Sequence, residues 1–379
     1  MKVMYISHRF KENVCATIHL DALREIVPPT NLYVVDLGSS DIEKGNEHHI
    51  IYGRMRPAEK ISRALHLTSF YLTPKRIESI IKYVQKLEID CIFIDESIWG
   101  KLVKRIKKSC ANTKVIVFYH DIAQYLYPYW LKTKGIKFLN ETIAGMLGEW
   151  INQKYADVNL VLNGREVEVF EHFYGRKPEG ILTMAVESPN FEATVAAEYT
   201  FEDAENRNYI LFVGSLYQPN IDGLEWFVKN VFCKLDNNYY LVVIGRGLDR
   251  LAPKYKQYPN VDIVGGVESL APYYNNANIV VAPIFDGGGM KQKTAEAFAY
   301  GKAFIGTTES LHGYEVALEI EEKGNRLVYC ANTPEEQIQA INCLIELKNE
   351  RMHHQLFELY RSTYSKEAVI NTLRHWGII

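Results

Sequence analysis

The chain has 379 residues, of which 47% are hydrophobic and 23% charged, and its formal net charge is −3. This composition is that of a globular protein large enough for two domains, and the small negative charge gives no electrostatic support for nucleic-acid binding. No apolar run approaches the roughly 20 residues that span a bilayer. The apolar stretch among the first residues is too short, and too often interrupted by polar residues, for a signal peptide.

The first half of the chain alternates short apolar runs with helical patterns. Strands are expected over residues 2–7, 32–37, 91–94, 115–119 and 158–162. Helices are expected over residues 14–24, 78–87, 102–110, 137–155 and 164–174. Strands and helices that alternate in this way predict an α/β domain with a parallel sheet. We place this first domain at residues 1–190.

Polar side chains follow two of these strands. Residues 7–9 (Ser-His-Arg) come after the first strand, and His120 and Asp121 come directly after the strand at residues 115–119. Ligands in open α/β sheets bind at the carboxyl ends of strands. We therefore predict that His120 faces a ligand. Asp121 is a candidate for a sugar or acceptor contact, with a helix N-cap as the alternative role.

Aromatic and basic side chains alternate in the segment that follows. Residues 125–130 read YLYPYW, and Lys132, Lys134 and Lys137 come next. Such a segment suits an anionic membrane surface, where a lipid-linked acceptor would be found. The alternative is that the aromatic side chains pack in a groove between domains. The six cysteines show no metal spacing, so we expect reduced thiols in a cytoplasmic protein, with peripheral contact at the inner face of the membrane under the first interpretation.

A linker and a second domain are predicted in the rest of the chain. Residues 191–207 lack a regular pattern and include an acidic run, which indicates a linker. Strands are expected at 210–213, 240–244, 261–264, 279–282 and 303–305, and helices at 222–232, 268–274, 293–300, 334–347, 350–360 and 366–376. We place the second domain at residues 208–365 and a closing helix in residues 366–379.

Small residues follow the successive strands of this second domain. They include Gly214 and Ser215 after one strand, Gly245 after the next, and Val267 just beyond a Gly-Gly pair. Because the carboxyl ends of parallel strands share one sheet edge, these residues predict a glycine-lined rim that binds a nucleotide.

The stretch from residue 279 to residue 306 carries most of the functional argument. A buried strand is followed by Asp286 and three glycines, Gly287, Gly288 and Gly289, and then by Met290 and a helix. Glycine permits positive φ and close approach of a ligand, so the amides of this turn can point at a phosphate. Gly288, Gly289 and Met290 are nucleotide-binding candidates, and Asp286 and Gly287 are candidates for the sugar or acceptor.

Two lysines lie where the helix begins. Lys291 and Lys293 meet the positive end of the helix dipole, which disfavours a cation by a few tenths to roughly 1 kcal/mol. An anion in the turn removes this penalty, so a phosphate site is predicted; the alternative is a surface loop with solvated lysines. Glu296, three residues after Lys293, is placed to accept hydrogen bonds from ribose hydroxyls, or is a first-turn glutamate favoured by the dipole.

The run GGGMKQKTAEAFAYGKAFIGT resembles the nucleotide-sugar signature of GT-B glycosyltransferases, specifically the large family 4 of retaining enzymes. The resemblance implies two Rossmann-like domains that face a central cleft, with the closing helix packed back on the first domain. It matches Glu296 with the ribose-binding glutamate and His120 with a histidine that contacts the donor sugar. Many members carry a further glutamate eight positions before the first, but here that position is Gly288, and the sugar contact stays unassigned.

Together these features predict a glycosyltransferase. It would move a sugar from a nucleotide diphosphate sugar to a hydroxyl of a saccharide or lipid-linked acceptor, in cell-surface polysaccharide or glycoconjugate synthesis. Lys291, Lys293 and His120 are the catalytic candidates, and the lysines would stabilise the departing diphosphate. The chain has no D-x-D pair, so we expect neither a metal nor another cofactor. A nucleotide-sugar epimerase of the same fold and a non-catalytic GT-B partner subunit are the alternatives.

Overall fold

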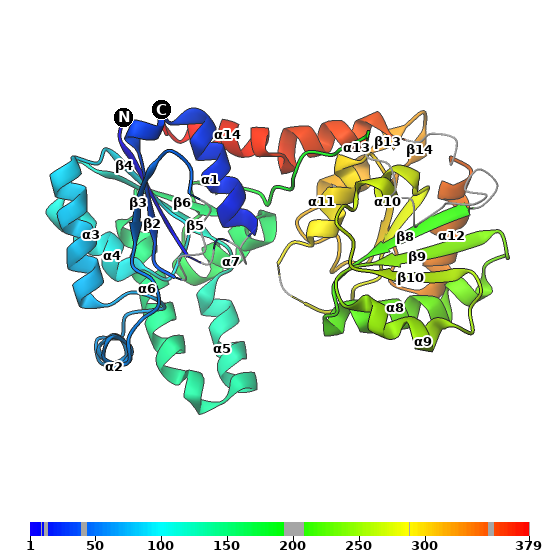
Figure 1. Ribbon diagram of the computed structural model, residues 1–379, viewed down its shortest axis with the longest axis horizontal. Helices are drawn as coiled ribbons and strands as arrows, with labels where there is room; N and C mark the ends of the chain where they lie inside the picture. Colours follow the sequence, from blue (N-terminus) through cyan, green and yellow to red (C-terminus); the bar gives the residue numbers. More distant parts are fainter. Residues whose placement is uncertain are drawn as a thin grey trace. The chain divides into compact units, whose positions relative to one another are not determined.

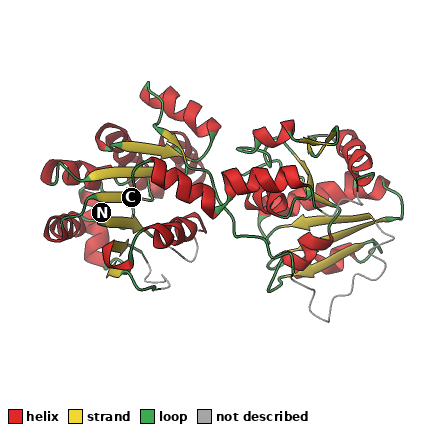
Figure 2. Ribbon diagram, turned by 90° about the horizontal axis from the view of Figure 1, so that it is seen from above, coloured by secondary structure: helices red, strands yellow, loops and turns green. Residues whose placement is uncertain are grey.

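The computed structural model describes residues 1–8, 10, 14–38, 44–192, 208–287, 289–347 and 352–378. The chain divides into two compact units: Met1–Met184 with Lys366–Ile379, and Ala185–Ser365. In each unit, helices cover both faces of a parallel sheet (Figures 1 and 2). Most of the predicted linker, residues 193–207, lies outside the described residues.

The first unit is built on a seven-stranded sheet within the described residues. In spatial order its strands are β3 (His48–Ile51), β2 (Leu32–Asp36), β1 (Val3–Ser7), β4 (Cys91–Ile94), β5 (Lys114–Tyr119), β6 (Val158–Val161) and β7 (Gly180–Ile181). The central strand β1 pairs in parallel with β2 and with β4, and all five of its residues are buried. Burial on both faces explains why these strands appear in the sequence as continuous apolar runs.

The helices of the first unit surround this sheet, and several of them bury an apolar stripe, whereas α2 has no buried residue. They are α1 (Val14–Ile26), α2 (Pro57–Leu65), α3 (Pro74–Leu87), α4 (Gly100–Ser109), α5 (Ala123–Lys134), α6 (Leu139–Tyr155), α7 (Gly164–Tyr174) and α14 (Lys366–His375). In α3, for example, Ile77, Ile80, Ile81 and Val84 recur at helical spacing and are buried. Helix α14 lies beside α1 (Figure 1), and Lys366 forms an ion pair with Glu25.

The second unit repeats the same plan. Its six-stranded sheet runs in the order β10 (Val261–Gly265), β9 (Tyr239–Ile244), β8 (Asn208–Val213), β11 (Ile279–Ala282), β12 (Ala303–Gly306) and β15 (Val328–Cys330). Its helices are α8 (Gln218–Asn230), α9 (Ala252–Tyr255), α10 (Ala271–Asn276), α11 (Gln292–Ala299), α12 (Pro334–Ile345) and α13 (His354–Leu359). A two-stranded hairpin consists of β13 (Glu321–Glu322) and β14 (Asn325–Arg326).

Short helical turns complete the chain. The 3-10 turns are Pro29–Asn31, Ile136–Phe138, Phe232–Lys234, Leu248–Leu251 and Glu315–Glu319, and a π-helical turn spans Tyr360–Tyr364. Among the described residues, no helix combines the length and the apolar character needed to cross a membrane.

The strand order locates the places where ligands bind in such sheets. In each sheet the order reverses beside the first strand, between β1 and β4 in the first unit and between β8 and β11 in the second. At this switch point the connections leave toward opposite faces and open a crevice at the carboxyl ends. The loops after these strands therefore form the candidate sites.

The predicted α/β class with two parallel sheets is confirmed. Several boundaries differ from the prediction: residues 125–130 lie inside α5 rather than before a helix, and α10 begins at Ala271 rather than at residue 268. The helix expected at 350–360 is α13, which ends at Leu359 and continues into the π-helical turn. Strands β3 and β15 were not predicted, because one is polar and partly exposed and the other has only three residues.

Candidate functional site

Glycines line the carboxyl edge of the second sheet. The amide of Gly214 donates to the carbonyl of Ile244 at 2.8 Å, and the amide of Gly245 donates to the carbonyl of Gly265 at 2.7 Å. Gly245 has a φ of 150°, and a Cβ there would lie 1.3 Å from the Gly214 carbonyl oxygen. Only glycine fits at this position, so bare backbone forms the rim beside the switch point.

The turn after β11 is the glycine turn that the sequence predicts. Gly287 and Gly289 have φ values of 122° and 68°, which other residues rarely adopt. The Asp286 carboxylate accepts a hydrogen bond from the Gly287 amide at 2.7 Å, so it stabilises the turn locally. Gly288 lies outside the described residues. Met290 is buried and packs near Gly313.

Helix α11 begins directly after this turn. Its N-cap is Lys291, and no side chain caps the helix. The lysine side chain has no oxygen that could accept a hydrogen bond from the first amides, so it leaves those of Gln292 and Lys293 uncapped, whereas the Thr294 amide donates to the Lys291 carbonyl at 3.0 Å. The strand, the glycine turn and the helix start together form the type of site that binds phosphate groups in α/β proteins.

Lys293 lies on the first turn of α11 and contacts residues of β8 and of the first turn of α8. Its Nζ donates to Asn220 Oδ1 at 2.7 Å and lies 5.0 Å from the centre of the Phe212 ring. Asn220 in turn donates to the Ser215 carbonyl at 3.0 Å. Burial lowers the pKa of Lys293 to about 7. The side-chain amide of Asn220, which was not predicted, thus links two predicted residues. These are Ser215, in the loop after β8, and Lys293, on α11.

Lys291 has a different partner. Its Nζ donates to Glu309 Oε1 at 2.7 Å and to the Gly289 carbonyl at 3.0 Å. Glu309 comes from the loop after β12. Lys291 is therefore held next to the glycine turn, and its charge is balanced by a carboxylate in this structure.

Glu296 lies one turn further along α11. Its Oε2 accepts from the Tyr274 hydroxyl at 2.9 Å, and its Oε1 accepts from the Gln292 amide at 3.0 Å. Burial raises the pKa of Glu296. Tyr274 stacks on Tyr300, with ring centres 5.0 Å apart, which holds its hydroxyl in place. Each carboxylate oxygen has one protein donor and retains a lone pair for a further donor.

Val267 is the predicted residue that lies farthest along this edge. It follows β10, and β9 and β8 separate that strand from β11. The structure therefore does not place Val267 next to the glycine turn, whereas Gly214 and Ser215 follow the strand that pairs with β11.

In the first unit, His120 follows β5 and pairs with a buried carboxylate. Its Nε2 lies 3.0 Å from Asp95 Oδ1, and its side chain is 23% exposed. Asp95 also accepts from the Tyr5 hydroxyl at 2.5 Å and lies 3.3 Å from the ring of His19. Burial disfavours the charged ring, but the Asp95 carboxylate outweighs it and raises the pKa of His120 well above its usual value. The Asp95 carboxylate therefore favours the imidazolium form of His120.

The pKa of Asp95 is shifted in the opposite direction. Burial alone would raise it, but His120 and His19 outweigh burial and hold the pKa of Asp95 below its usual value. Ser7 and His8, from the loop after β1, lie at the same edge: Ser7 Oγ is 3.5 Å from Asp95, and His8 is 4.0 Å from Glu96. Arg9 lies outside the described residues.

Asp121 does not cap the helix that follows it. Helix α5 begins at Ala123, and its first amides, those of Ala123 and Gln124, donate to the buried carboxylate of Glu149 at 2.8 and 3.1 Å. The N-cap role considered for Asp121 is therefore wrong. Its negative charge contributes, after burial, to the raised pKa of Glu166, which reaches about 7.

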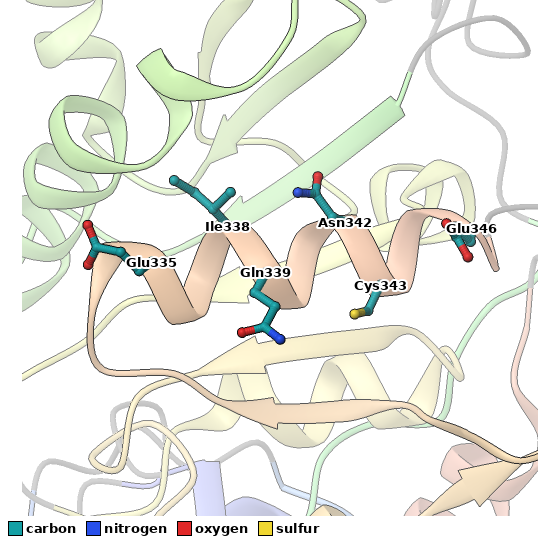
Figure 3. A pocket seen from close by; sticks show the side chains of 6 residues that line it. All are labelled: Glu335, Ile338, Gln339, Asn342, Cys343 and Glu346. Carbon is teal, nitrogen blue, oxygen red and sulfur yellow. The ribbon is translucent and has the colours of Figure 1, made fainter.

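A depression along α12 is a further feature of the second unit. Figure 3 shows a depression of about 490 Å³ along α12, lined by Glu335, Ile338, Gln339, Asn342, Cys343 and Glu346. None of the predicted site residues lines it. Within the described part of the chain, no group of three or more His, Cys, Asp or Glu side chains could hold a metal ion.

Four residues of these sites were not predicted from the sequence: Asn220, Tyr274, Glu309 and Asp95. Asn220 is 73 positions from Lys293, and Asp95 is 25 positions from His120, so no local pattern joins them. The one usable signal was that Asp95 directly follows a buried strand, at the same edge as His120.

The chain is similar to known proteins in one segment of its sequence and in its fold. Residues 207–347 match the family model described as "Glycosyl transferases group 1". Among solved structures, Anabaena HepE in complex with UDP has a TM-score of 0.67 at 11% identity, and the match covers 99% of each chain. HepE has also been solved with UDP-glucose.

Two further solved structures show the same fold. Sucrose-phosphate synthase from Thermosynechococcus elongatus has a TM-score of 0.66 at 16% identity and covers 99% of this chain and 98% of its own. The lipopolysaccharide outer core galactosyltransferase WaaB has a TM-score of 0.64 at 14% identity and covers 100% of both chains. No curated protein matches the sequence.

Proposed function

We propose that this protein is a glycosyltransferase that uses a nucleotide diphosphate sugar as donor; the match of residues 207–347 to the glycosyl transferases group 1 model supports this proposal. In this proposal the sugar passes to the hydroxyl of a saccharide or lipid-linked acceptor, in cell-surface polysaccharide or glycoconjugate synthesis. HepE binds UDP and UDP-glucose, and WaaB acts on the lipopolysaccharide core, which supports donors and pathways of these kinds.

The convergence of two loops at the β8–β11 switch point is the observation that carries the proposal. The glycine turn after β11 ends at a helix start without a side-chain cap, and Lys293 reaches from that helix to Asn220 in the first turn of α8, which follows the β8 loop. A diphosphate at this point would meet helix amides, two lysines and the glycine rim. A ribose beside it would meet Glu296.

The chemistry follows from the charge that develops at this point. As the bond between the anomeric carbon and the phosphate oxygen breaks, its electron pair leaves with the nucleoside diphosphate, and the sugar becomes oxocarbenium-like. Lys291, Lys293 and the turn amides would stabilise the leaving diphosphate. The acceptor hydroxyl then bonds to the anomeric carbon, and its proton passes to an oxygen of the departing diphosphate. Retention of configuration is expected from the resemblance of the motif.

His120 is assigned to the donor sugar in this proposal. Its imidazolium, fixed by Asp95, is a charge-assisted donor to a sugar hydroxyl or to a phosphate oxygen. Asp121, Asp286 and Gly287 remain candidates for contacts with the sugar or the acceptor. The proposal does not assign any of them to a particular atom of either.

A donor screen tests the proposal directly. Thermal shift with UDP, GDP and ADP and their sugars should identify one nucleotide that stabilises the protein, and the matching sugar should be consumed only when an acceptor is present. Lys291→Ala with Lys293→Ala should weaken binding by roughly 1.5–3 kcal/mol for each lost charge-assisted contact. The control pair Lys229→Ala with Lys256→Ala removes two exposed lysines from the same unit and should bind as the wild type does.

Each alternative function has its own signature in this experiment. Conversion of the sugar without an acceptor would indicate an epimerase. Binding without any conversion across a broad acceptor panel would favour a non-catalytic partner subunit. Equal affinity in the site pair and the control pair would remove the phosphate site from the proposal.

A further inference from the structure

One surface of the first unit exposes large apolar side chains at the end where α2 and α5 lie (Figure 1). Ile136 is 81% exposed and Leu65 is 78% exposed. The exposed apolar side chains of this surface, here called the tip surface, are Ile61, Leu65, Tyr129, Ile136, Leu139 and Ile143. An apolar cluster of this kind on a folded protein marks a binding surface.

The elements that form the tip surface are joined to each other. Arg63 of α2 forms an ion pair with Glu141 of α6, and the Asn140 side chain donates to the Ala64 carbonyl at 3.1 Å. Trp130 of α5 packs edge-on against Phe138, with ring centres 5.7 Å apart. The exposed residues therefore belong to one fixed surface and not to separate loops.

The charge of the tip surface is positive. Residues 123–139 include Lys132, Lys134 and Lys137 and no acidic residue, and all three lysines are exposed. The carboxylate of Glu141 is neutralised by Arg63. Lys134 lies 4.1 Å from the centre of the Trp130 ring, which keeps its ammonium beside an aromatic face. A second copy of the chain would present the same cations to these lysines, so like-charge repulsion disfavours self-association through this surface.

We propose that the tip surface binds an anionic phospholipid membrane. Leu65, Ile136 and Leu139 would enter the boundary between headgroups and acyl chains, and the lysines would contact lipid phosphates. Helix α5 begins at Ala123, three positions after His120, so the bound surface would connect directly with the sheet edge that carries His120. The inference concerns binding alone and does not depend on the proposed activity.

Co-sedimentation of the full chain with vesicles tests this proposal. The protein should pellet with vesicles of phosphatidylcholine and phosphatidylglycerol, and far less with phosphatidylcholine alone. Each lysine near an anionic surface contributes about a five-fold gain in partitioning. Lys132→Gln, Lys134→Gln and Lys137→Gln combined should therefore lower binding to anionic vesicles by at least about ten-fold. Leu65→Ser with Ile136→Ser should lower it as well, because the apolar contact is lost.

A matched control removes the same charge elsewhere in the same unit. Lys82→Gln, Lys86→Gln and Lys108→Gln change three exposed lysines of α3 and α4 and should leave binding unchanged. Thermal melts should show that all variants are folded. Equal pelleting of the tip and control variants would overturn the proposal, as would equal binding to both kinds of vesicle. Sedimentation equilibrium without vesicles that showed a dimer abolished by Leu65→Ser with Ile136→Ser would assign the surface to a second copy instead.

Discussion

Lys291 and Lys293 lie two positions apart at the start of α11 and yet differ in their electrostatic surroundings. Lys291 faces the carboxylate of Glu309 at 2.7 Å, whereas Lys293 faces the neutral amide oxygen of Asn220 and the Phe212 ring. Burial lowers the pKa of Lys293 to about 7, so this lysine is only partly charged at neutral pH. It is therefore the residue whose charge responds most to an incoming anion.

We expect nucleotide-sugar binding to be accompanied by proton uptake at Lys293. A bound diphosphate favours the ammonium form, so the pKa of Lys293 rises above about 7 in the complex. Affinity should then fall as pH increases above that value and level off below it. For each tenfold rise in the proton affinity of Lys293 on binding, the binding free energy becomes more favourable by about 1.4 kcal/mol. Calorimetry above neutral pH, in buffers of different ionisation enthalpy, measures the number of protons taken up.

Lys293→Arg provides the control for this measurement. The guanidinium stays charged across the range, so binding in this variant should take up no proton. Burial also raises the pKa of the neighbouring Glu296, which makes it the competing source of a linked proton. If Lys293→Arg took up as many protons as the wild type, the titrating group would be Glu296 and not Lys293.

Glu296→Gln tests the ribose contact. Glutamine keeps the size of the side chain but accepts ribose hydroxyls less strongly, so affinity for a ribonucleotide should fall by roughly 1–2 kcal/mol. Affinity for the 2′,3′-dideoxy analogue should hardly change, because it has no hydroxyl to donate. Isothermal titration with both ligands measures the difference. Equal losses would mean that Glu296 serves mainly to hold Tyr274 and the start of α11.

At the scale of single residues, the sequence predicts side chains whose role follows from local chain geometry. Lys291 and Lys293 could be singled out because cations at a helix start are unfavourable without an anion. Glu309 and Asn220, which fix these lysines, could not be found in this way, because their contacts form only when separate strand ends meet.

At the scale of elements, Gly245 shows how closely two strand ends approach. A Cβ at this position would overlap the carbonyl of Gly214, and its φ of 150° is unfavourable for other residues. Gly245→Ala should therefore lower the free energy of unfolding by about 2–4 kcal/mol. Gly266→Ala is the matched control, since its nearest contact would be an ordinary 3.5 Å from Arg246. Urea denaturation of both variants measures the effect, and equal stabilities would contradict the close approach.

The boundaries of elements were predicted best where burial alone determines them. Strand β11 and helix α7 have the expected ends, because one is a fully buried apolar run and the other is capped by its own neighbour, Asn163. Helix α5 was missed over residues 125–130. Its first amides donate hydrogen bonds to the carboxylate of Glu149 in α6. Because this cap is distant in the sequence, the helix begins without a local signal, and it continues through Pro128.

At the scale of the whole molecule, the two units share one strand order, and each carries candidate residues of its own. Lys291, Lys293 and Glu296 follow the switch point of the second sheet, and His120 follows a strand next to the switch point of the first. The alternation of strands and helices in the sequence was sufficient to predict five strands of each sheet, because each sheet repeats a local βα pattern. The pairing of His120 with Asp95, by contrast, depends on β4 and β5 lying side by side.

This division predicts that nucleotide binding and sugar transfer can be separated by substitution. His120→Ala should leave nucleotide affinity within about two-fold of the wild type, because the proposed diphosphate contacts all belong to the other unit. It should lower the rate of transfer by at least about ten-fold, because a charge-assisted contact is lost where charge develops. Calorimetry and a coupled assay of released nucleotide measure the two quantities. His172→Ala, which removes an exposed histidine of the same unit, should change neither.

The response of the wild type to EDTA tests how the charge of the leaving diphosphate is stabilised. If lysines and backbone amides supply this stabilisation, EDTA should leave the rate of transfer essentially unchanged in the wild type. Loss of activity that magnesium or manganese restores would contradict this mechanism.

Asp95→Asn should act like a milder His120→Ala. The imidazolium loses its carboxylate, so the pKa of His120 should fall, and the rate of transfer should decline as pH rises through that lower value. Full turnover of His120→Ala at every pH would instead assign the His120–Asp95 pair to the stability of the first unit.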